Sequence, residues 1–276
     1  MSHEKYQHLL ALLRDCRRVI VALSGGLDSS FLLYAAVQAN GVAATLAAIG
    51  VSDSLAESER AFAADFARSL GLSAANIITI ATREIEDDNY AANPPNRCYF
   101  CKSELYTRLN DLAAQREHEV VCDGANASDL GDHRPGMIAA RERRVRSPLL
   151  EADLTKDEIR ALAREFGLSV WDKPQSACLA SRIPYGSTVT PEKLRQIDQA
   201  ESFLRSLGFT QLRVRHHDQI ARIELPVADM SRVINNGIRE QINRRFHEIG
   251  FLFVTLDVAG FQSGSMNAML KGRSDE

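Results

Sequence analysis

The hydrophobic pattern of residues 1–185 alternates between short apolar runs and longer amphipathic stretches. The runs are rich in β-branched residues and too short for buried helices, so they predict strands, whereas apolar side chains three and four positions apart predict helices. The predicted strands are 18–23, 42–51, 76–80 and 119–122, and the predicted helices around them are 5–17, 31–37, 55–70, 100–115 and 156–166. This alternation predicts an α/β fold with a doubly wound parallel sheet.

A different pattern follows the Pro-punctuated stretch 184–191. The predicted elements there are a helix at 192–207, strands at 212–216 and 220–225, a helix at 229–249 and a strand at 251–257. The order α-β-β-α-β is typical of a small α+β unit, part of a ferredoxin-like arrangement. We therefore predict two domains, residues 1–185 and residues 186–276.

A loop rich in glycine and serine separates the first predicted strand from the helix that follows it. Glycines let the backbone turn sharply towards a ligand, and serine hydroxyls and the first helical amides donate hydrogen bonds, so the loop suits a phosphate. It is neither the Lys-containing phosphate loop of common ATPases nor a dinucleotide fingerprint, and the simpler alternative is a serine-capped turn. The candidate pyrophosphate-binding residues are Ser24, Gly25, Gly26, Asp28, Ser29 and Ser30.

Composition and charge narrow the function classes. The net charge is −3 and the pI is near 6.2, so the chain has no overall electrostatic footprint for nucleic acid. No apolar run approaches the length of a membrane span, and no signal-peptide core follows the first residues, so we expect a cytoplasmic protein. A polar loop at 123–136 is too long to be idle, while the basic run at 141–146 is typical of a solvated helix face.

The five cysteines are an odd number in a chain without an export signal, which favours metal binding or catalysis over disulfides. Cys98 and Cys101 lie three positions apart at a predicted helix start, and Cys178 lies in a Pro-punctuated loop. Three hypotheses follow: a [4Fe-4S] cluster with one open iron, a zinc site with His133 or another group as fourth ligand, or an incidental pair with Cys178 acting alone. Cys16 and Cys122 are predicted core residues without a role.

The glycine-serine loop resembles the signature of the PP-loop ATP pyrophosphatases, which cleave ATP between its α and β phosphates. Over nearly the full chain, the sequence is similar to the LarE family. The motifs that carry this resemblance are Ser-Gly-Gly-Leu-Asp-Ser-Ser at 24–30, Asp-Gly-x-Asn-x-x-Asp at 123–129, His-Arg-Pro-Gly at 133–136, Cys-Leu-Ala-Ser-Arg-Ile-Pro-Tyr-Gly at 178–186, Arg-Val-Arg-His at 213–216, Ala-Arg-Ile-Glu-Leu-Pro at 221–226 and Gly-Phe-x-x-Val-Thr-Leu-Asp at 250–257.

The resemblance implies an ATP-dependent sulfur transferase of nickel-pincer cofactor biosynthesis. Such an enzyme adenylates a carboxylate of pyridinium-3,5-biscarboxylic acid mononucleotide and replaces it with a thiocarboxylate, using ATP and Mg²⁺. One branch of the family sacrifices the sulfur of the cysteine matching Cys178. This sequence departs from that branch by adding Cys98 and Cys101, which favours a [4Fe-4S] cluster held by the three cysteines and an exogenous sulfide.

The resemblance also assigns nucleotide and substrate contacts. The nucleotide-loop residues are Asp123, Asn126, Asp129 and Arg134, and the substrate-binding residues are Ser181, Arg182, Arg213, Arg215, Glu201 and Glu224. Independently of the family, Arg213 and Arg215 alternate on one predicted strand and share a face suited to phosphate, although ion pairing with Glu224 is an alternative. His216 and His217 are predicted as a solvated strand end.

Two rival functions remain at this stage. A tRNA thiolase also combines a PP-loop with paired cysteines, but it needs a basic surface or an added RNA-binding domain that this composition does not indicate. The second rival is a nucleotide- or metal-binding regulatory module. It is less favoured than an enzyme, because an adenylating loop and thiols that converge on it serve no obvious purpose in such a module. The family resemblance further implies a small nucleotide substrate, no nucleic acid, and a homo-oligomer.

Overall fold

The computed structural model describes residues 2–116, 120–130, 135–174, 177–235 and 237–262. The chain forms two compact units that are not contiguous in sequence. Unit 1 comprises residues 1–84 and 96–176, and unit 2 comprises residues 85–95 and 177–276. The predicted division into domains after residue 185 stays a prediction.

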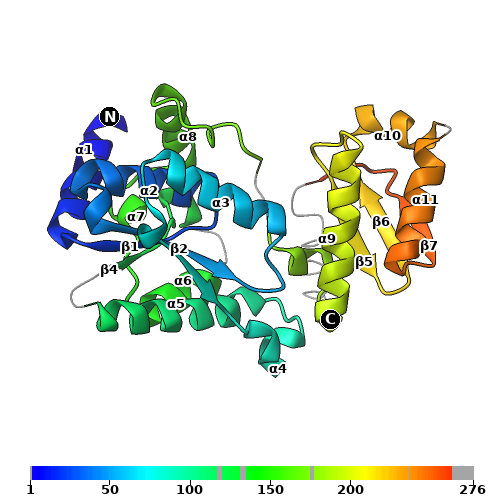
Figure 1. Ribbon diagram of the computed structural model, residues 1–276, viewed down its shortest axis with the longest axis horizontal. Coiled ribbons are helices and arrows are strands. Elements are labelled where there is room, and N and C mark those ends of the chain that lie inside the picture. The colour runs from blue at the N-terminus through cyan, green and yellow to red at the C-terminus, as the bar shows by residue number, and fades with distance from the viewer. Residues whose placement is uncertain (1, 117–119, 131–134, 175–176, 236, 263–276) are drawn as a thin grey trace. The chain divides into compact units, whose positions relative to one another are not determined.

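Unit 1 is built on a sheet of four parallel strands (Figure 1). The strands are β1 (Val19–Ala22), β2 (Thr45–Val51), β3 (Ile77–Ala81) and β4 (Val120–Cys122), in the spatial order β3-β2-β1-β4. The chain therefore leaves β1 towards β2 on one side and later reaches β4 on the other. Such a change of direction opens a crevice at the carboxyl ends of β1 and β4, and α/β proteins bind ligands at this kind of place.

Helices cover both faces of this sheet, which confirms the predicted doubly wound α/β fold (Figure 1). Side chains alternate along β1, so Val19 and Val21 pack on one face and Ile20 and Ala22 on the other. The first face is covered by α1 (Ser2–Cys16), α2 (Leu27–Asn40), α3 (Glu57–Ser69), α7 (Pro148–Glu151) and α8 (Lys156–Glu165), and the second by α5 (Arg97–Gln115) and α6 (Pro135–Glu142). Short 3-10 helices lie at Val42–Ala44, Ala74–Asn76, Glu84–Glu86 and Ala127–Asp129.

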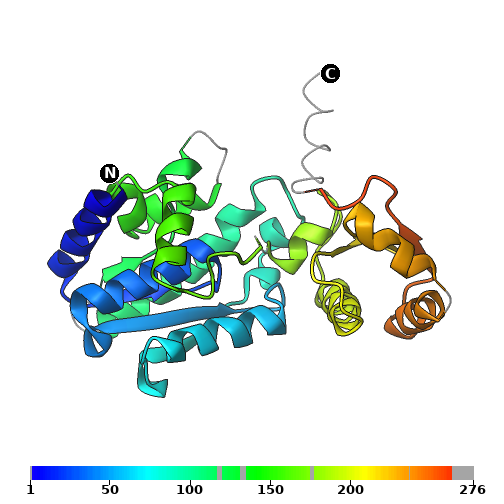
Figure 2. The same cartoon turned by 90° about the horizontal axis from the view of Figure 1, so that it is seen from above.

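Unit 2 contains a smaller mixed sheet with the order β5-β6-β7. Its elements are α4 (Asp88–Ala91), a 3-10 helix (Leu179–Arg182), α9 (Pro191–Ser206), β5 (Arg213–His217), β6 (Ile220–Glu224), α10 (Val227–Ile234), α11 (Ile238–Ile249) and β7 (Phe253–Leu256). β6 pairs antiparallel with β5 and parallel with β7. The helices α9 and α11 lie side by side and pack on one face of the sheet (Figures 1 and 2).

The single helix predicted at 229–249 is wrong, because two helices occupy this stretch. α10 ends at Ile234, and Asn235 adopts an extended conformation. Gly237 then takes a φ of +89°, a left-handed conformation that only glycine adopts without strain. The Asn-Asn-Gly stretch between the two apolar patterns is a turn signal that the helical periodicity on either side concealed.

The sequence of 84–97 is acidic and then rich in Asn and Pro, which predicts a loop at the carboxyl edge of the sheet. In the structure, residues 85–95 of this segment belong to unit 2 and contain α4. Its anchor is Asn93, which is fully buried. The Asn93 side-chain amide donates to the carbonyl oxygens of Ile183 at 3.2 Å, Pro184 at 2.7 Å and Ser187 at 3.1 Å. The Gly186 amide donates in return to the Asn93 carbonyl at 3.0 Å, so the segment is tied to the chain just before α9.

His216 is not solvated, contrary to the prediction, because its β5 position faces the helices and only 3% of its surface is exposed. Its Nε2 bonds Gln196 Oε1 at 2.9 Å, and its ring packs 5.2 Å from that of Phe251, centroid to centroid. Burial, together with the nearby Lys193 charge, lowers the pKa of His216 to about 4.

This buried histidine makes the stability of the protein sensitive to mild acid. Below a pH of about 6.5, His216 binds a proton in the unfolded chain, whereas in the folded protein it stays neutral down to a pH of about 4. Protonation therefore favours the unfolded state in this range, and the free energy of unfolding falls as the pH falls. We expect this residue to contribute about 2 kcal/mol to the loss of unfolding free energy between pH 7 and pH 5. Urea unfolding at both pH values should show a smaller loss in His216→Gln. Removal of the exposed His8 by His8→Gln should leave the loss unchanged, and an equal loss in all three proteins would contradict the assignment.

Candidate active site

The glycine-serine loop connects β1 to the amino end of α2, as the sequence predicts. Gly25 adopts a φ of +76°, and a Cβ built on it would lie 3.2 Å from the Cβ of Ala63 on α3. The Ser24 and Ser29 hydroxyls are 3.0 Å apart, and the Ser29 hydroxyl donates to the Gly26 carbonyl. The loop therefore holds its shape through its own serines and leaves a helix amino end, which favours anions, at the edge of the sheet.

The loop after β4 packs directly on this helix end. A Cβ built on Gly124 would lie 2.8 Å from the Ser29 amide nitrogen and 3.0 Å from the Ser29 Cα. Contact this close between two backbones requires glycine. The predicted pyrophosphate-binding loop and the predicted nucleotide loop thus meet at the crevice beside β1 and β4.

The polar residues of the nucleotide loop are hydrogen-bonded to neighbouring side chains and to the backbone of the loop itself. The Asp123 carboxylate accepts hydrogen bonds from the Tyr106 and Ser147 hydroxyls, each at 2.7 Å. Burial and the Asp123 charge raise the pKa of the Tyr106 phenol well above its usual range, which keeps Tyr106 a donor. Asn126 and Asp129 form a reciprocal capping box around the 3-10 helix Ala127–Asp129. These contacts fix the loop against α2.

Two of the predicted site residues, Asp28 and Ser30, belong to α2. Asp28 lies in the first turn of α2, where its carboxylate is 3.6 Å from the Lys156 ammonium. Ser30 is fully buried in the same helix. Arg134 and the proposed zinc ligand His133 lie outside the described residues.

Lys173 is a contact of the loop that the sequence did not reveal. Its ammonium donates to the Gly25 carbonyl at 2.9 Å and to the Glu59 carboxylate at 2.7 Å. The same ammonium lies 3.5 Å from the centroid of the Phe62 ring, a cation–π contact. Lys173 thus ties the loop to α3. Its position in an irregular stretch gave no periodic signal.

Cys98 and Cys101 lie in the first turn of α5 in unit 1. Cys98 is exposed and Cys101 is half-buried. The i, i+3 spacing places both thiols on one side of the helix, and the helix amino end favours thiolates. Within the part of the chain that the structure describes, no three His, Cys, Asp or Glu side chains gather as a metal site.

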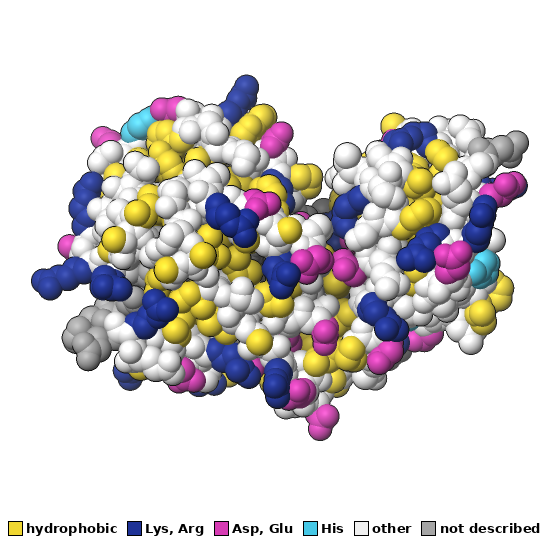
Figure 3. All heavy atoms as spheres, in the orientation of Figure 1, with side chains coloured by type: hydrophobic (Ala, Val, Ile, Leu, Met, Phe, Trp, Pro, Cys, Tyr) yellow, Lys and Arg dark blue, Asp and Glu magenta, His cyan; other side chains and the backbone are white. Residues whose placement is uncertain are grey.

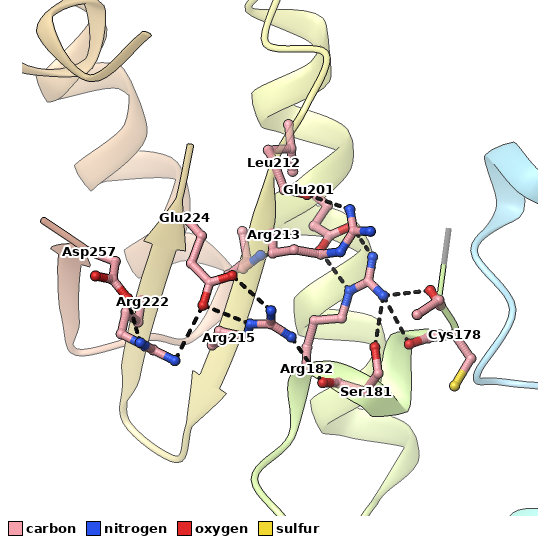
Figure 4. Close-up of polar contacts among 12 residues, drawn as sticks. Cys178, Ser181, Arg182, Glu201, Leu212, Arg213, Arg215, Arg222, Glu224 and Asp257 are labelled. Atoms are coloured by element: carbon pink, nitrogen blue, oxygen red, sulfur yellow. Dashed lines mark hydrogen bonds and ion pairs between the residues drawn. The ribbon is translucent and has the colours of Figure 1, made fainter. Parts of the chain in front are cut away.

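Cys178 lies in unit 2, directly before the 3-10 helix Leu179–Arg182, and is exposed. Arg182 holds the backbone around it: one guanidinium nitrogen donates to the Cys178 carbonyl and to the Ser181 hydroxyl, each at 3.0 Å (Figure 4). The sulfur of Cys178 points away from this guanidinium (Figure 4). Arg182 therefore positions the cysteine without covering its thiol.

A buried carboxylate in turn fixes Arg182. Glu201 on α9 accepts from Arg182 at 2.9 and 3.1 Å, from Arg205 at 2.9 Å and from the Val214 amide at 3.1 Å. Burial opposes ionisation of Glu201, but the arginines outweigh it and hold the pKa of this carboxyl below its ordinary value. Arg205 was not predicted.

Arg215 repeats this arrangement on the face of the sheet opposite the helices. It donates to both oxygens of Glu224 at 3.0 and 2.8 Å, and to the Ser181 carbonyl at 3.1 Å. The alternative prediction was a surface ion pair with Glu224. Arg215 does pair with Glu224, but the pair is buried and not at the surface. The predicted substrate-binding residues of unit 2 come together around the Cys178 segment, and two of the arginines are engaged by carboxylates.

Arg213 sits in a region with surplus positive charge. Burial and the charges of Arg182 and Arg215 lower the pKa of its guanidinium to about 10. The guanidinium donates to the Leu212 carbonyl and lies over the Phe261 ring. The arginines of this region are Arg182, Arg205, Arg213, Arg215 and Arg222, and the carboxylates paired with them are Glu201, Glu224 and Asp257. Among the described residues, these five arginines outnumber the three carboxylates, which favours binding of an anion.

A comparison with known proteins decides the family. The chain is 41% identical over 262 residues to pyridinium-3,5-bisthiocarboxylic acid mononucleotide synthase of Lactiplantibacillus plantarum, an alignment that covers 95% of this chain and 93% of that protein. The chain belongs to the LarE family. It is an ATP-dependent enzyme of the PP-loop class and a LarE-like sulfurtransferase.

The chain is also similar to a second full-length relative and to one solved structure. The chain is also 41% identical over 270 residues to an uncharacterized protein of a Synechocystis strain, covering 98% of this chain and 99% of that protein. An NH3-dependent NAD synthetase from Campylobacter jejuni shares 16% identity at a TM-score of 0.47, covering 90% of this chain and 95% of that one. No protein-family model matches the chain.

Surface charge and helix composition add two observations on this LarE-family enzyme. The face shown in Figure 3 mixes basic and acidic side chains over both units. Among the described residues, no helix has the length and apolar character needed to cross a membrane. The expectations of a homo-oligomer and of no nucleic-acid partner stay predictions.

Proposed function

We propose that this enzyme adenylates a carboxylate of pyridinium-3,5-biscarboxylic acid mononucleotide and converts it into a thiocarboxylate. The product named for the Lactiplantibacillus plantarum relative motivates the substrate. The observation that carries the proposal is the arginine-rich region around Cys178, whose surplus positive charge suits a substrate with one phosphate and two carboxylates. Arg213 is the arginine that we assign to the substrate anion.

The adenylation step belongs to the loop after β1. The substrate carboxylate attacks the α-phosphorus of ATP, and the bond to the leaving pyrophosphate breaks. We assign the amide groups at the start of α2 to the charge that develops on pyrophosphate. The Ser24 and Ser29 hydroxyls bond within the loop in this structure, and we assign them to the same charge once they turn towards the bound phosphates. Mg²⁺ enters with ATP, and the Asp28 carboxylate offers it an oxygen ligand of the kind it prefers.

The sulfur step requires a thiol group close to the acyl-adenylate. The residue types support an iron–sulfur cluster, because cysteine thiolates are its usual ligands, Cys98 and Cys101 lie three positions apart on α5, and Cys178 is exposed. A [4Fe-4S] cluster held by these three cysteines would leave one iron without a protein ligand and would supply a place for an exogenous sulfide. Arg182 keeps the Cys178 backbone in place, and AMP leaves once sulfur has replaced it on the carbonyl carbon.

The experiment combines metal analysis with product analysis on anaerobically purified protein. We expect about four irons and four acid-labile sulfides per chain, and formation of AMP and pyrophosphate that depends on the nucleotide substrate. Cys98→Ser should lose the cluster and the thiocarboxylate product while still forming AMP. The control Cys16→Ala removes a buried cysteine outside the set and should retain the iron.

Two other outcomes contradict separate parts of the proposal. An iron-free protein in which Cys178 loses the mass of hydrogen sulfide after turnover would replace the cluster with sacrifice of the Cys178 sulfur. Absence of AMP formation with this substrate, together with modification of a tRNA, would replace the substrate itself.

A further inference from the structure

The peptide between Gly25 and Gly26 determines which way the glycine-serine loop presents its polar groups. Gly25 has a φ of +76° and Gly26 has a φ of −78°. Rotation of this peptide by about 180° would exchange the directions of its carbonyl and amide groups. It would also carry the φ of Gly26 to a positive value, which glycine adopts without strain. Two adjacent glycines therefore leave the orientation of this peptide open.

The observed orientation is the one that suits an anion. The Gly26 amide lies 3.4 Å from the Ser24 hydroxyl, which is itself 3.0 Å from the Ser29 hydroxyl. The C=O and N–H groups of a trans peptide point in opposite directions, so the Gly25 carbonyl points away from the side on which the Gly26 amide meets these hydroxyls. In the flipped orientation, a carbonyl oxygen would lie among the groups that we assign to pyrophosphate and would repel it.

Lys173 occupies the carbonyl side of this peptide. Its ammonium donates to the Gly25 carbonyl at 2.9 Å and to the Glu59 carboxylate at 2.7 Å, and it lies 3.5 Å from the centroid of the Phe62 ring. Its backbone is fixed as well, because the Lys173 amide donates to the carbonyl of the fully buried Val170 at 3.2 Å. The Lys173 and Glu59 side chains are 15% and 20% exposed, so solvent screens their ion pair less than it screens a surface pair.

We propose that Lys173 is a positioning residue that holds the peptide between Gly25 and Gly26 in its anion-binding orientation. The charge-assisted hydrogen bond favours this orientation over the flipped one, because the flip would take the Gly25 carbonyl away from the ammonium. Glu59 and Phe62 keep the ammonium in place. Lys173 acts through the loop and does not contact the nucleotide. This inference rests on the proposed role of the loop in binding the phosphates of ATP.

Loss of Lys173 should therefore affect ATP binding more than turnover. If the flipped peptide becomes the more populated one by about ten to one, the apparent dissociation constant for ATP rises about tenfold. Enzyme that is saturated with ATP has already adopted the binding-competent orientation, so kcat at saturating ATP should stay within about twofold of wild type. A lysine that neutralised the leaving pyrophosphate directly would instead lower kcat.

The test measures ATP and AMP binding to the full-length protein by isothermal titration calorimetry, with Mg²⁺ and without the nucleotide substrate. Lys173→Met should weaken ATP binding about tenfold and AMP binding less than about twofold, because AMP lacks the two phosphates that leave as pyrophosphate. Lys173→Arg should bind ATP more tightly than Lys173→Met, since it restores a cationic donor for the Gly25 carbonyl. The rate of AMP formation at varied ATP concentration gives KM and kcat for each variant.

Lys5 provides a matched control in the same unit. Its ammonium also bonds both a backbone carbonyl and a carboxylate, those of Asp153 at 2.6 Å and Glu158 at 3.0 Å, but these partners lie outside the loop. Lys5→Met should leave the ATP affinity unchanged. Equal ATP affinity in Lys5→Met and Lys173→Met, with both folded by circular dichroism, would contradict the inference. A lowered kcat with an unchanged KM in Lys173→Met would also contradict it.

Gly124→Ala separates failure of this inference from failure of the proposed phosphate site. The added methyl group would press on the Ser29 amide at the start of α2, whatever the role of Lys173. If Gly124→Ala weakens ATP binding and Lys173→Met does not, only the role of Lys173 is wrong. If neither variant changes ATP binding, the phosphates do not bind at this loop, and the proposed adenylation site is wrong as well.

Discussion

Gly124→Ala is expected to reduce the rate of AMP formation at least about a hundredfold. The added methyl group would lie 2.8 Å from the Ser29 amide nitrogen and 3.0 Å from the Ser29 Cα, both backbone atoms at the start of α2. Neither atom can move without displacing the helix end that holds the phosphates, and a displacement of about 1 Å is enough for a loss of this size. The expected defect is in phosphate positioning, and the rest of unit 1 should stay folded.

A matched control is available at Gly50 on β2. A methyl group there would lie 2.9 Å from a methyl carbon of Leu105, almost the same distance, but the neighbour is the end of a flexible side chain. Gly50→Ala should therefore cost about 1–3 kcal/mol of stability by overpacking and leave the rate within a few-fold of wild type. Pyrophosphate release and circular dichroism measure both effects. Equal rates in the two variants would show that the Gly124 contact does not position the loop.

Glu201→Ala is expected to lower the unfolding free energy of the protein by about 3–5 kcal/mol. The substitution removes the carboxylate from Arg182, whose side chain is 1% exposed, and leaves that guanidinium charged and uncompensated in the interior. It also removes the acceptor of the Val214 amide on the outer edge of β5. Urea denaturation of wild type and variant measures the difference.

The control for this prediction is an exposed ion pair in the same unit. Arg245 and Glu248 on α11 are 3.0 Å apart, with side chains 43% and 53% exposed. Glu248→Ala should change the unfolding free energy by less than about 1 kcal/mol, because solvent screens the pair. Should Glu201→Ala prove as mild as Glu248→Ala while the affinity for the nucleotide substrate collapses, Glu201 would be a ligand-binding residue and not a support of Arg182.

Local patterns were sufficient for most of the fold. Short β-branched runs predicted the four described strands of unit 1, and the three described strands of unit 2 also lie where strands were predicted. The glycine-serine loop was also predictable, because a tight turn between strand and helix needs residues without bulk. These features depend on neighbours in sequence, which is why the sequence displays them.

Contacts between distant residues were not predictable in the same way. Lys173 reaches Gly25 across 148 positions, and Asn93 reaches Ile183 across 90. Neither residue belongs to a periodic stretch that would indicate its partner. The arginines of unit 2 were predicted to bind substrate, and pairing with Glu224 was only the alternative. Nothing in the sequence indicated that Glu201 engages Arg182, because that pair depends on the packing of α9.

The hydrogen bonds of Asn93 attach residues 85–95 to unit 2, which is therefore built from two separate stretches of the sequence. A fragment that starts at residue 177 or 186 would contain every strand of the smaller sheet. It would lack the Asn93 side-chain amide, which donates hydrogen bonds to three carbonyl oxygens of the chain before α9. During synthesis, residues 85–95 leave the ribosome long before residues 183–187, to which Asn93 is hydrogen-bonded, have been made. Unit 2 can therefore complete its folding only after unit 1 has been fully translated, so the order of synthesis favours a finished ATP-binding unit first.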